Sequence, residues 1–149
     1  MKILLTGGTG VLGERVVPLL VKEGHEVVTV SRRPEASRWL TRAGAEPLRL
    51  DLLDPAQVGL AASGVEAIVN LATAIPQPPR ALFRRSWSTN DQLRRDASRV
   101  LAAAAIESGA RFVQESFAPT YPDQADRWIT EDQELVVRYV SCLSVRCSG

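Results

Sequence analysis

The sequence predicts an α/β protein built on a doubly wound parallel sheet. Its first residues form an apolar run that ends in closely spaced glycines. Short apolar and β-branched runs then recur along the chain, and segments of helical periodicity separate them. Because strands that alternate with helices are joined by right-handed crossovers, we expect the strands to be parallel and covered by helices on both faces.

Size and composition indicate one globular domain. The chain has 149 residues, 45% of them hydrophobic and 23% charged, and a formal net charge of +1. This charge does not favour nucleic acid or a membrane surface. The apolar start is too short for a spanning helix or a signal peptide, so we expect a cytoplasmic protein. One histidine, His25, and two cysteines, Cys142 and Cys147, do not suffice for a zinc site.

The opening residues predict a strand, a tight turn and a helix. Residues 3–5 are the strand, Gly7, Gly10 and Gly13 form the turn, and an amphipathic segment begins at Val11. At Gly7 and Gly10 bare backbone could approach a pyrophosphate, to which the helix N-terminus presents unpaired N–H groups. Gly13 would let the helix lie close to the strand. The alternative is a glycine turn that binds nothing.

The run TGGTGVLG at residues 6–13 resembles the cofactor fingerprint of the short-chain dehydrogenase/reductase superfamily, most closely its extended, NAD-dependent epimerase/dehydratase branch. The resemblance extends to about Leu135. It implies a Rossmann-like NAD(P)-binding domain over residues 1–135, followed by a tail at 136–149 of unassigned structure. The residues that it assigns to the cofactor at this turn are Gly7, Thr9, Gly10, Val11, Leu12 and Gly13.

The segments after the turn predict a helix and a second strand. The helix contains Pro18 and ends at Gly24, and the strand at residues 27–30 is β-branched throughout, as in buried parallel strands. His25, at the entry to this strand, is interpreted as a solvated connector. The apolar positions expected to face the sheet are Leu12, Val16, Leu19 and Leu20.

The end of the second strand carries the residues that would select the cofactor. An NAD site usually places a carboxylate there, which binds the ribose 2′-hydroxyl and would repel a 2′-phosphate. This chain has Ser31, Arg32 and Arg33 instead. Two guanidiniums and a hydroxyl suit a phosphate, so the sequence favours NADP, with NAD as the second choice. The alternative is that both arginines belong to a solvated loop.

A helix at residues 34–43 and a third strand at 45–50 follow. The strand runs into Asp51 and Leu52, which resemble the family's pair beside the adenine. By that resemblance Asp51 would accept a hydrogen bond from the exocyclic amine and Leu52 would cover a ring face. Asp54 is interpreted as the N-cap of the next helix, a structural role.

The fourth strand is expected at residues 65–72 and ends in a turn that resembles the family's Asn/His-x-Ala-Gly/Ala sequence. By that resemblance the turn passes under the ribose and the nicotinamide. It assigns Leu71, Ala72 and Thr73 to the cofactor site. A buried strand end would require small residues as well.

Residues 81–109 are expected to be mostly helical, with a break near residues 86–88, and residues 110–115 form the fifth strand. The family places an asparagine near the start of this helix, facing the cofactor, and Asn90 fits that place. The arginines of the predicted helix are interrupted by acidic residues, and no stacking aromatics are interleaved with them. They therefore predict a solvated face and no nucleic-acid site.

The resemblance fails at the catalytic residues. In the run ESFAPTYP at residues 115–122, the position of the family's active hydroxyl falls on Phe117, and Ser116 lies one place early. Four residues after Tyr139 stands Leu143 in place of the lysine of the family's Tyr-x-x-x-Lys. The catalytic residues are therefore unknown.

The resemblance also stops where the substrate domain of an extended enzyme would begin, so we expect a truncated fold with an exposed sheet edge. A partner or a second copy of the chain could cover this edge. The expected function is that of an NADP-preferring protein of oxidoreductase or sugar-epimerase lineage with an unidentified small-molecule substrate. Whether catalysis is impaired stays open. The alternatives are a non-catalytic NADP-binding regulatory module and an inactive fragment.

Overall fold

The computed structural model describes residues 1–116, 125–130 and 132, and it contains a five-stranded sheet in the order β3-β2-β1-β4-β5. Every neighbouring pair of strands is parallel, which confirms the predicted fold class. From β1 the chain proceeds outward to β3, then crosses back to β4 on the other side of β1. The strands are β1 (Lys2–Thr6), β2 (Glu26–Val30), β3 (Glu46–Leu48), β4 (Ala67–Asn70) and β5 (Arg111–Gln114).

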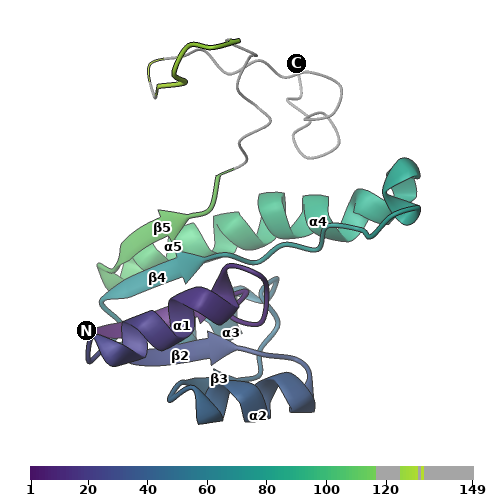
Figure 1. The fold of residues 1–149 in the computed structure, drawn as a ribbon. Coiled ribbons are helices and arrows are strands. Elements are labelled where there is room, and N and C mark those ends of the chain that lie inside the picture. The colour runs from purple at the N-terminus through teal and green to yellow at the C-terminus, as the bar shows by residue number, and fades with distance from the viewer. Residues whose placement is uncertain (117–124, 131, 133–149) are drawn as a thin grey trace.

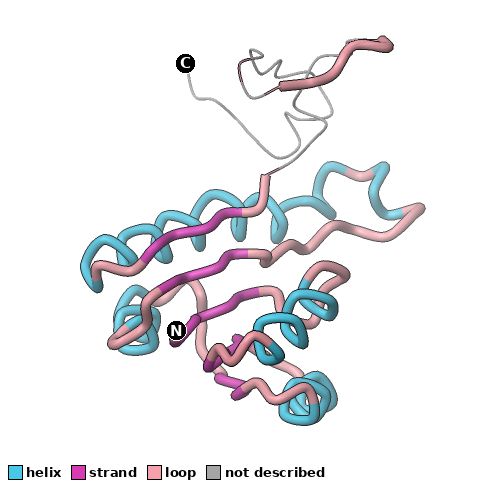
Figure 2. The backbone as a smooth tube through the Cα atoms, turned by 60° about the vertical axis from the view of Figure 1, so that its left-hand side comes forward, coloured by secondary structure: helices cyan, strands magenta, loops and turns pink. Residues whose placement is uncertain are grey.

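Helices cover both faces of this sheet. Figure 1 shows α1 in front of the strands and α3 and α5 behind them, and the turned view of Figure 2 shows helices on both sides. The helices are α1 (Gly13–Lys22), α2 (Pro34–Arg42), α3 (Pro55–Ala62), α4 (Ser88–Gln92) and α5 (Ser98–Ser108), with 3₁₀ turns η1 (Arg80–Leu82) and η2 (Arg84–Trp87) and a π-helical turn η3 (Leu93–Ala97). Within the described residues, no helix combines the length and the apolar sequence needed to cross a membrane.

Alternate residues of the central strand supply two separate cores. Leu4 packs with residues of α3 and α5, whereas Leu5 packs with residues of α1 and α2. Both leucines are completely buried, as expected for successive side chains of a strand covered on both faces. The two cores hold β1 in place, and with it the glycine turn that follows.

The sheet-facing side of α1 differs from the predicted one. Leu12 and Leu19 are 48% and 60% exposed, whereas Val17 is completely buried. The expectation that Leu12 and Leu19 face the sheet is therefore wrong. The helix begins at Gly13, two residues later than predicted, and Val17 lies about 200° from Leu19 around its axis.

The long helical segment after β4 also begins later than predicted. Residues from Arg80 to Trp87 form the two 3₁₀ turns, and the indole nitrogen of Trp87 donates to the carbonyl of Ala81 at 2.8 Å. From Ser88 the chain is helical up to Ser108, where Gly109 ends it with φ +71°. The apolar side of this helix faces the core, where Ala97, Leu101, Ala104 and Ala105 are buried.

Candidate functional site

A cleft of about 990 Å³ lies at the carboxyl ends of the strands. Its walls are the loops that follow β1, β2, β3 and β4, together with residues of α4 and η3. The chain reverses its order of strands between β1 and β4, and clefts at such a reversal are where open parallel sheets bind ligands. Of the residues predicted to bind a cofactor, those that line the cleft are Gly7, Thr9, Gly10, Ser31, Arg32, Arg33, Asp51, Leu52, Leu71, Ala72 and Thr73.

The glycines after β1 have three different roles. Gly7 has φ +74°, and a Cβ atom there would collide with the carbonyl of Leu71. A Cβ atom on Gly13 would collide with the backbone of Gly7 and Gly8, so the start of α1 lies close against the turn that follows β1. At Gly10 the nearest atom to a Cβ would be the carbonyl oxygen of Gly7, at 3.3 Å. Gly7 is therefore required by the loop after β4, whereas Gly10 borders the open cleft.

Val11, Leu12 and Gly13 do not line the cleft, although the sequence assigns them to the cofactor. Val11 is 80% exposed and Leu12 is 48% exposed. Within the described residues, the amides of Val11 and Leu12 donate no hydrogen bond. What these two residues offer at the start of α1 is therefore their N–H groups and not their side chains.

The loop after β2 brings two guanidiniums to the cleft. Ser31 is 6% exposed, and its hydroxyl donates to the carbonyl of Arg33 at 3.3 Å and accepts from the hydroxyl of Ser37 at 3.2 Å. Arg32 and Arg33 are exposed on the cleft wall. The hydroxyl of Ser31 thus shapes the loop, and the two arginines supply its charge.

The loop after β3 is fastened to the first turn of α3. The amide of Asp51 donates to Oε1 of Gln57 at 3.1 Å, and Oδ1 of Asp51 accepts from the amide of Leu53 at 3.0 Å. Asp54 caps α3, because its Oδ1 accepts from the amides of Ala56 and Gln57. This confirms the predicted structural role of Asp54. The hydrogen bonds from the backbone and side chain of Gln57 hold the pKa of Asp54 below its ordinary value.

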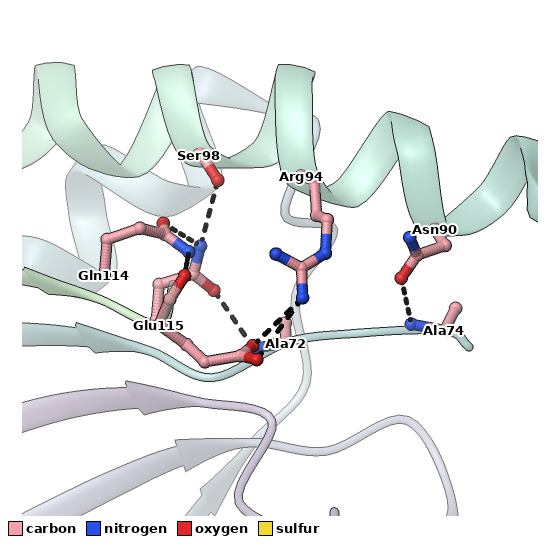
Figure 3. A network of polar contacts seen from close by, with 8 residues as sticks. Ala72, Ala74, Asn90, Arg94, Ser98, Gln114 and Glu115 are labelled. Atoms are coloured by element: carbon pink, nitrogen blue, oxygen red, sulfur yellow. Dashed lines mark hydrogen bonds and ion pairs between the residues drawn. The ribbon is translucent and has the colours of Figure 1, made fainter. Parts of the chain in front are cut away.

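Asn70 fixes the end of β4 through hydrogen bonds to neighbouring elements, and Figure 3 labels three of its partners, Ala72, Ser98 and Gln114. It is 1% exposed, and its Nδ2 donates to Gln114 at 2.8 Å and to Ser98 at 3.2 Å. Its Oδ1 accepts from the hydroxyl of Thr6 at 2.5 Å and from the amide of Ala72 at 3.2 Å. One side chain thus joins β1, β4, β5 and α5 directly behind the cleft residues Leu71, Ala72 and Thr73.

Asn90 lies behind the cleft wall. It is 1% exposed, and its Oδ1 accepts from the amide of Ala74 at 3.2 Å (Figure 3). The residues of α4 and η3 that line the cleft are Thr89, Gln92 and Leu93. The structure therefore gives Asn90 a role in holding the loop after β4 and does not place it on the cleft wall.

An ion pair joins η3 to the chain after β5. Nη2 of Arg94 lies 3.3 Å from Oε1 of Glu115, and the two side chains are 13% and 21% exposed (Figure 3). The pair stands beside Asn70 and not in the cleft. This ion pair and the hydrogen bond between Asn70 and Ser98 together fasten the helical segment to the end of the sheet.

Sequence reasoning missed Arg49 and Gln57, both of which line the cleft. A signal existed for Gln57, because Asp54 followed three residues later by a glutamine is a capping-box pattern. For Arg49 the signal was its place between two apolar residues at the end of a strand.

The positions compared with the family's catalytic residues lie mostly outside the described residues. Phe117, Tyr139 and Leu143 fall there, as do both cysteines. Ser116 is described and is exposed. Among the described residues no cluster of three or more histidine, cysteine, aspartate or glutamate side chains could hold a metal.

The chain matches one family model, described as the NAD dependent epimerase/dehydratase family, over residues 3–140. Among curated proteins, a 3-diazoavenalumate denitrifying reductase of a Streptomyces species is 31% identical over an alignment of 148 positions, which covers 92% of this chain and 44% of that protein. The photosystem II assembly factor Ycf39 of Trieres chinensis is 30% identical over 87 residues, 58% of this chain and 27% of that protein.

Solved structures show the same fold. A short-chain dehydrogenase/reductase superfamily protein from Agrobacterium tumefaciens with bound NAD has a TM-score of 0.74 and 26% identity, covering 97% of this chain and 42% of that one. A UDP-glucose-4-epimerase from Stenotrophomonas maltophilia with bound NAD has a TM-score of 0.78 and 19% identity, covering 95% and 44%. The chain thus spans less than half the length of each of these proteins.

Proposed function

The chain belongs to the NAD-dependent epimerase/dehydratase family, and from this premise we propose that its cleft binds a nicotinamide dinucleotide, with NADP preferred over NAD. The observation that carries the proposal is the meeting of two features in one cleft. The bare turn at Gly10 and the arginine pair after β2 both line it. A dinucleotide has a pyrophosphate for the first and, in NADP, a 2′-phosphate for the second.

The turn suits the pyrophosphate. Gly10 carries no side chain into the cleft, and the amides of Val11 and Leu12 are unused within the described part of the chain. Unpaired amides at a helix start, reinforced by the helix dipole, are the usual partners of a phosphate.

The other walls suit the two ends of the ligand. Asp51 and Leu52 lie on the loop after β3, beside the arginines, where an adenine would be held. Leu71, Ala72 and Thr73 lie on the loop after β4, where the nicotinamide would be held. Oδ2 of Asp51 makes no hydrogen bond within the described residues, so it can accept one from the exocyclic amine.

The bound dinucleotide would supply hydride transfer, and this chain's own residues would bind and orient it. We place the protein in the oxidoreductase or sugar-epimerase lineage. A non-catalytic NADP-binding module is the second candidate, because Leu143 stands where the family's lysine would lower the pKa of the tyrosine. Consumption of NADPH in the presence of carbonyl substrates, or interconversion of sugar epimers without net consumption of the nucleotide, favours the first candidate. Binding without either reaction favours the second.

The test is a titration of NADP and NAD followed by the fluorescence of Trp39, Trp87 and Trp128. Gly10→Ala should weaken both ligands at least about tenfold, because a methyl group enters the place of the pyrophosphate. Gly59→Ala is the matched control, since a Cβ atom there meets nothing within 4 Å. Equal affinities in the two variants, or no binding by the unmodified protein, would contradict the proposal.

A further inference from the structure

We propose that Arg49 is a third guanidinium of the 2′-phosphate site and determines, with Arg32 and Arg33, the preference for NADP. This inference rests on the proposed function. It concerns a residue that neither the glycine turn nor the second strand contains. The evidence is its position, its direction and the charge around it.

Arg49 leaves the sheet beside the arginine pair. Val30 pairs with Leu48 in the parallel register of β2 and β3. Beyond that pair, the amide of Ser31 donates to the carbonyl of Leu48 at 2.9 Å. Arg49 therefore follows β3, and Arg32 and Arg33 follow the neighbouring strand β2, all at the carboxyl end of the sheet.

The strand alternation directs Arg49 away from the core. Leu48 and Leu50, on either side of it, both pack in the core cluster that includes residues of α3 and α5. Successive side chains of an extended segment point to opposite sides, so Arg49 points away from this cluster. It is exposed and lines the cleft.

The charge on this wall is suited to a dianion. Within residues 1–116, 125–130 and 132, the guanidiniums of Arg32, Arg33 and Arg49 make no ion pair. Asp51 is the one carboxylate among the cleft-lining residues described, and its Oδ1 accepts from the amide of Leu53. Three positive charges thus face one negative charge. A phosphomonoester carries about −1.5 to −2 charges at neutral pH, whereas the 2′-hydroxyl of NAD carries none.

The experiment compares two nucleotides that differ by this phosphate, 2′,5′-ADP and 5′-AMP. Calorimetric titrations are made at low salt on the unmodified chain and on Arg49→Gln, Arg32→Gln and Arg42→Gln. Arg42 is the matched control, because it is exposed in the last turn of α2 and does not line the cleft. Arg49→Gln should weaken 2′,5′-ADP about tenfold, as expected for a lost charge-assisted contact, and leave 5′-AMP within about twofold. Arg42→Gln should change neither.

Other outcomes would overturn the inference in distinguishable ways. If Arg32→Gln selectively weakens 2′,5′-ADP and Arg49→Gln does not, the role of Arg49 is refuted while the proposed function stands. Equal weakening of both nucleotides by Arg49→Gln also refutes it. If the unmodified chain binds both nucleotides equally well, the NADP preference fails with it. If the unmodified chain binds none of 2′,5′-ADP, 5′-AMP, NADP and NAD, the proposal that the cleft binds a dinucleotide is refuted as well. Urea unfolding of each variant verifies that the chain is folded.

Discussion

At the scale of single residues, Gly7 shows that a motif glycine can be required by the fold. Its φ of +74° and the nearby carbonyl of Leu71 both exclude a side chain. From the sequence, Gly7 is explained by the close approach of a ligand to the backbone. The structure gives a second explanation, because the loop after β4 occupies the space of a side chain. This reason could not be read from the sequence, because Leu71 is 64 residues away.

Gly7→Ala should therefore lower the free energy of unfolding by about 3 kcal/mol, combining a left-handed backbone with a steric collision. The control is Gly24→Ala, because Gly24 also has a positive φ, +79°, but a Cβ atom there meets nothing within 4 Å. It should cost about 1 kcal/mol. Urea unfolding measures both, and equal losses would show that the contact with Leu71 does not matter.

Several residues of the cleft could be predicted individually, and others could not. Arg32 and Arg33 come one residue after a recognisable strand, so their place at the carboxyl end of the sheet could be inferred. Asn90 could not be placed, because its burial against Ala74 depends on where the loop after β4 passes. Arg49 has a sequence signal, its place between two apolar residues at the end of a strand, but its closeness to Arg32 and Arg33 depends on the pairing of β3 with β2.

At the scale of elements, Asn70 is the contact that holds the most of them together. Asn70→Ala would leave Thr6, Ser98 and Gln114 without their bonds to this buried amide. We expect a loss of about 3 kcal/mol in the free energy of unfolding, because unsatisfied buried polar groups cost about 1–3 kcal/mol each. Thr6→Val, which removes only one of these bonds, should cost about 1 kcal/mol. Similar losses in the two variants, measured by urea unfolding, would contradict this role.

The N-terminal cap of α3 should make stability depend on pH. The pKa of Asp54 is lower in the folded chain than its ordinary value, so its stabilising effect is full above the unfolded pKa of about 4 and is lost as the pH falls through the folded pKa. Asp54→Ala should thus destabilise the protein at pH 7 and progressively less below about pH 4. Urea unfolding of the unmodified protein and of Asp54→Ala, at pH 7 and below about pH 4, measures this difference.

The control for this cap is Asp54→Asn, which keeps an oxygen that can accept from the helix amides but carries no charge. It should be less destabilising than alanine at neutral pH. A destabilisation by alanine that stays constant with pH would mean that the charged carboxylate does not stabilise α3.

The sequence predicts which segments are strands and helices more reliably than it predicts which side of a helix faces the sheet. Five strands were expected and the described residues contain five, because β-branched and apolar runs bounded by glycines are distinctive. The side of α1 that faces the sheet was wrong, since Leu12 and Leu19 have the periodicity of a buried face but lie on the solvent side. Gly13 lies against the backbone of Gly7 and Gly8, and Val17, one turn further along the same side of the helix, is completely buried.

At the scale of the whole molecule, the order of the strands creates the site. The crossover from β3 back to β4 separates the loops after β1 and β4, and the cleft lies where they part. The alternation of strands and helices predicts this arrangement, because right-handed crossovers leave few other topologies. Of the described strands, β5 forms the edge opposite β3, and Val113 on it is 52% exposed.

The central claim is that this cleft binds a nicotinamide dinucleotide through the glycine turn and reads its 2′-phosphate through the arginines. Isothermal titration calorimetry of the unmodified chain with NADP and with NAD tests it most directly. We predict saturable heat with both, and an affinity for NADP about tenfold higher at low salt that falls toward that for NAD as salt is added. Folded protein that gives no heat with either nucleotide would contradict the account.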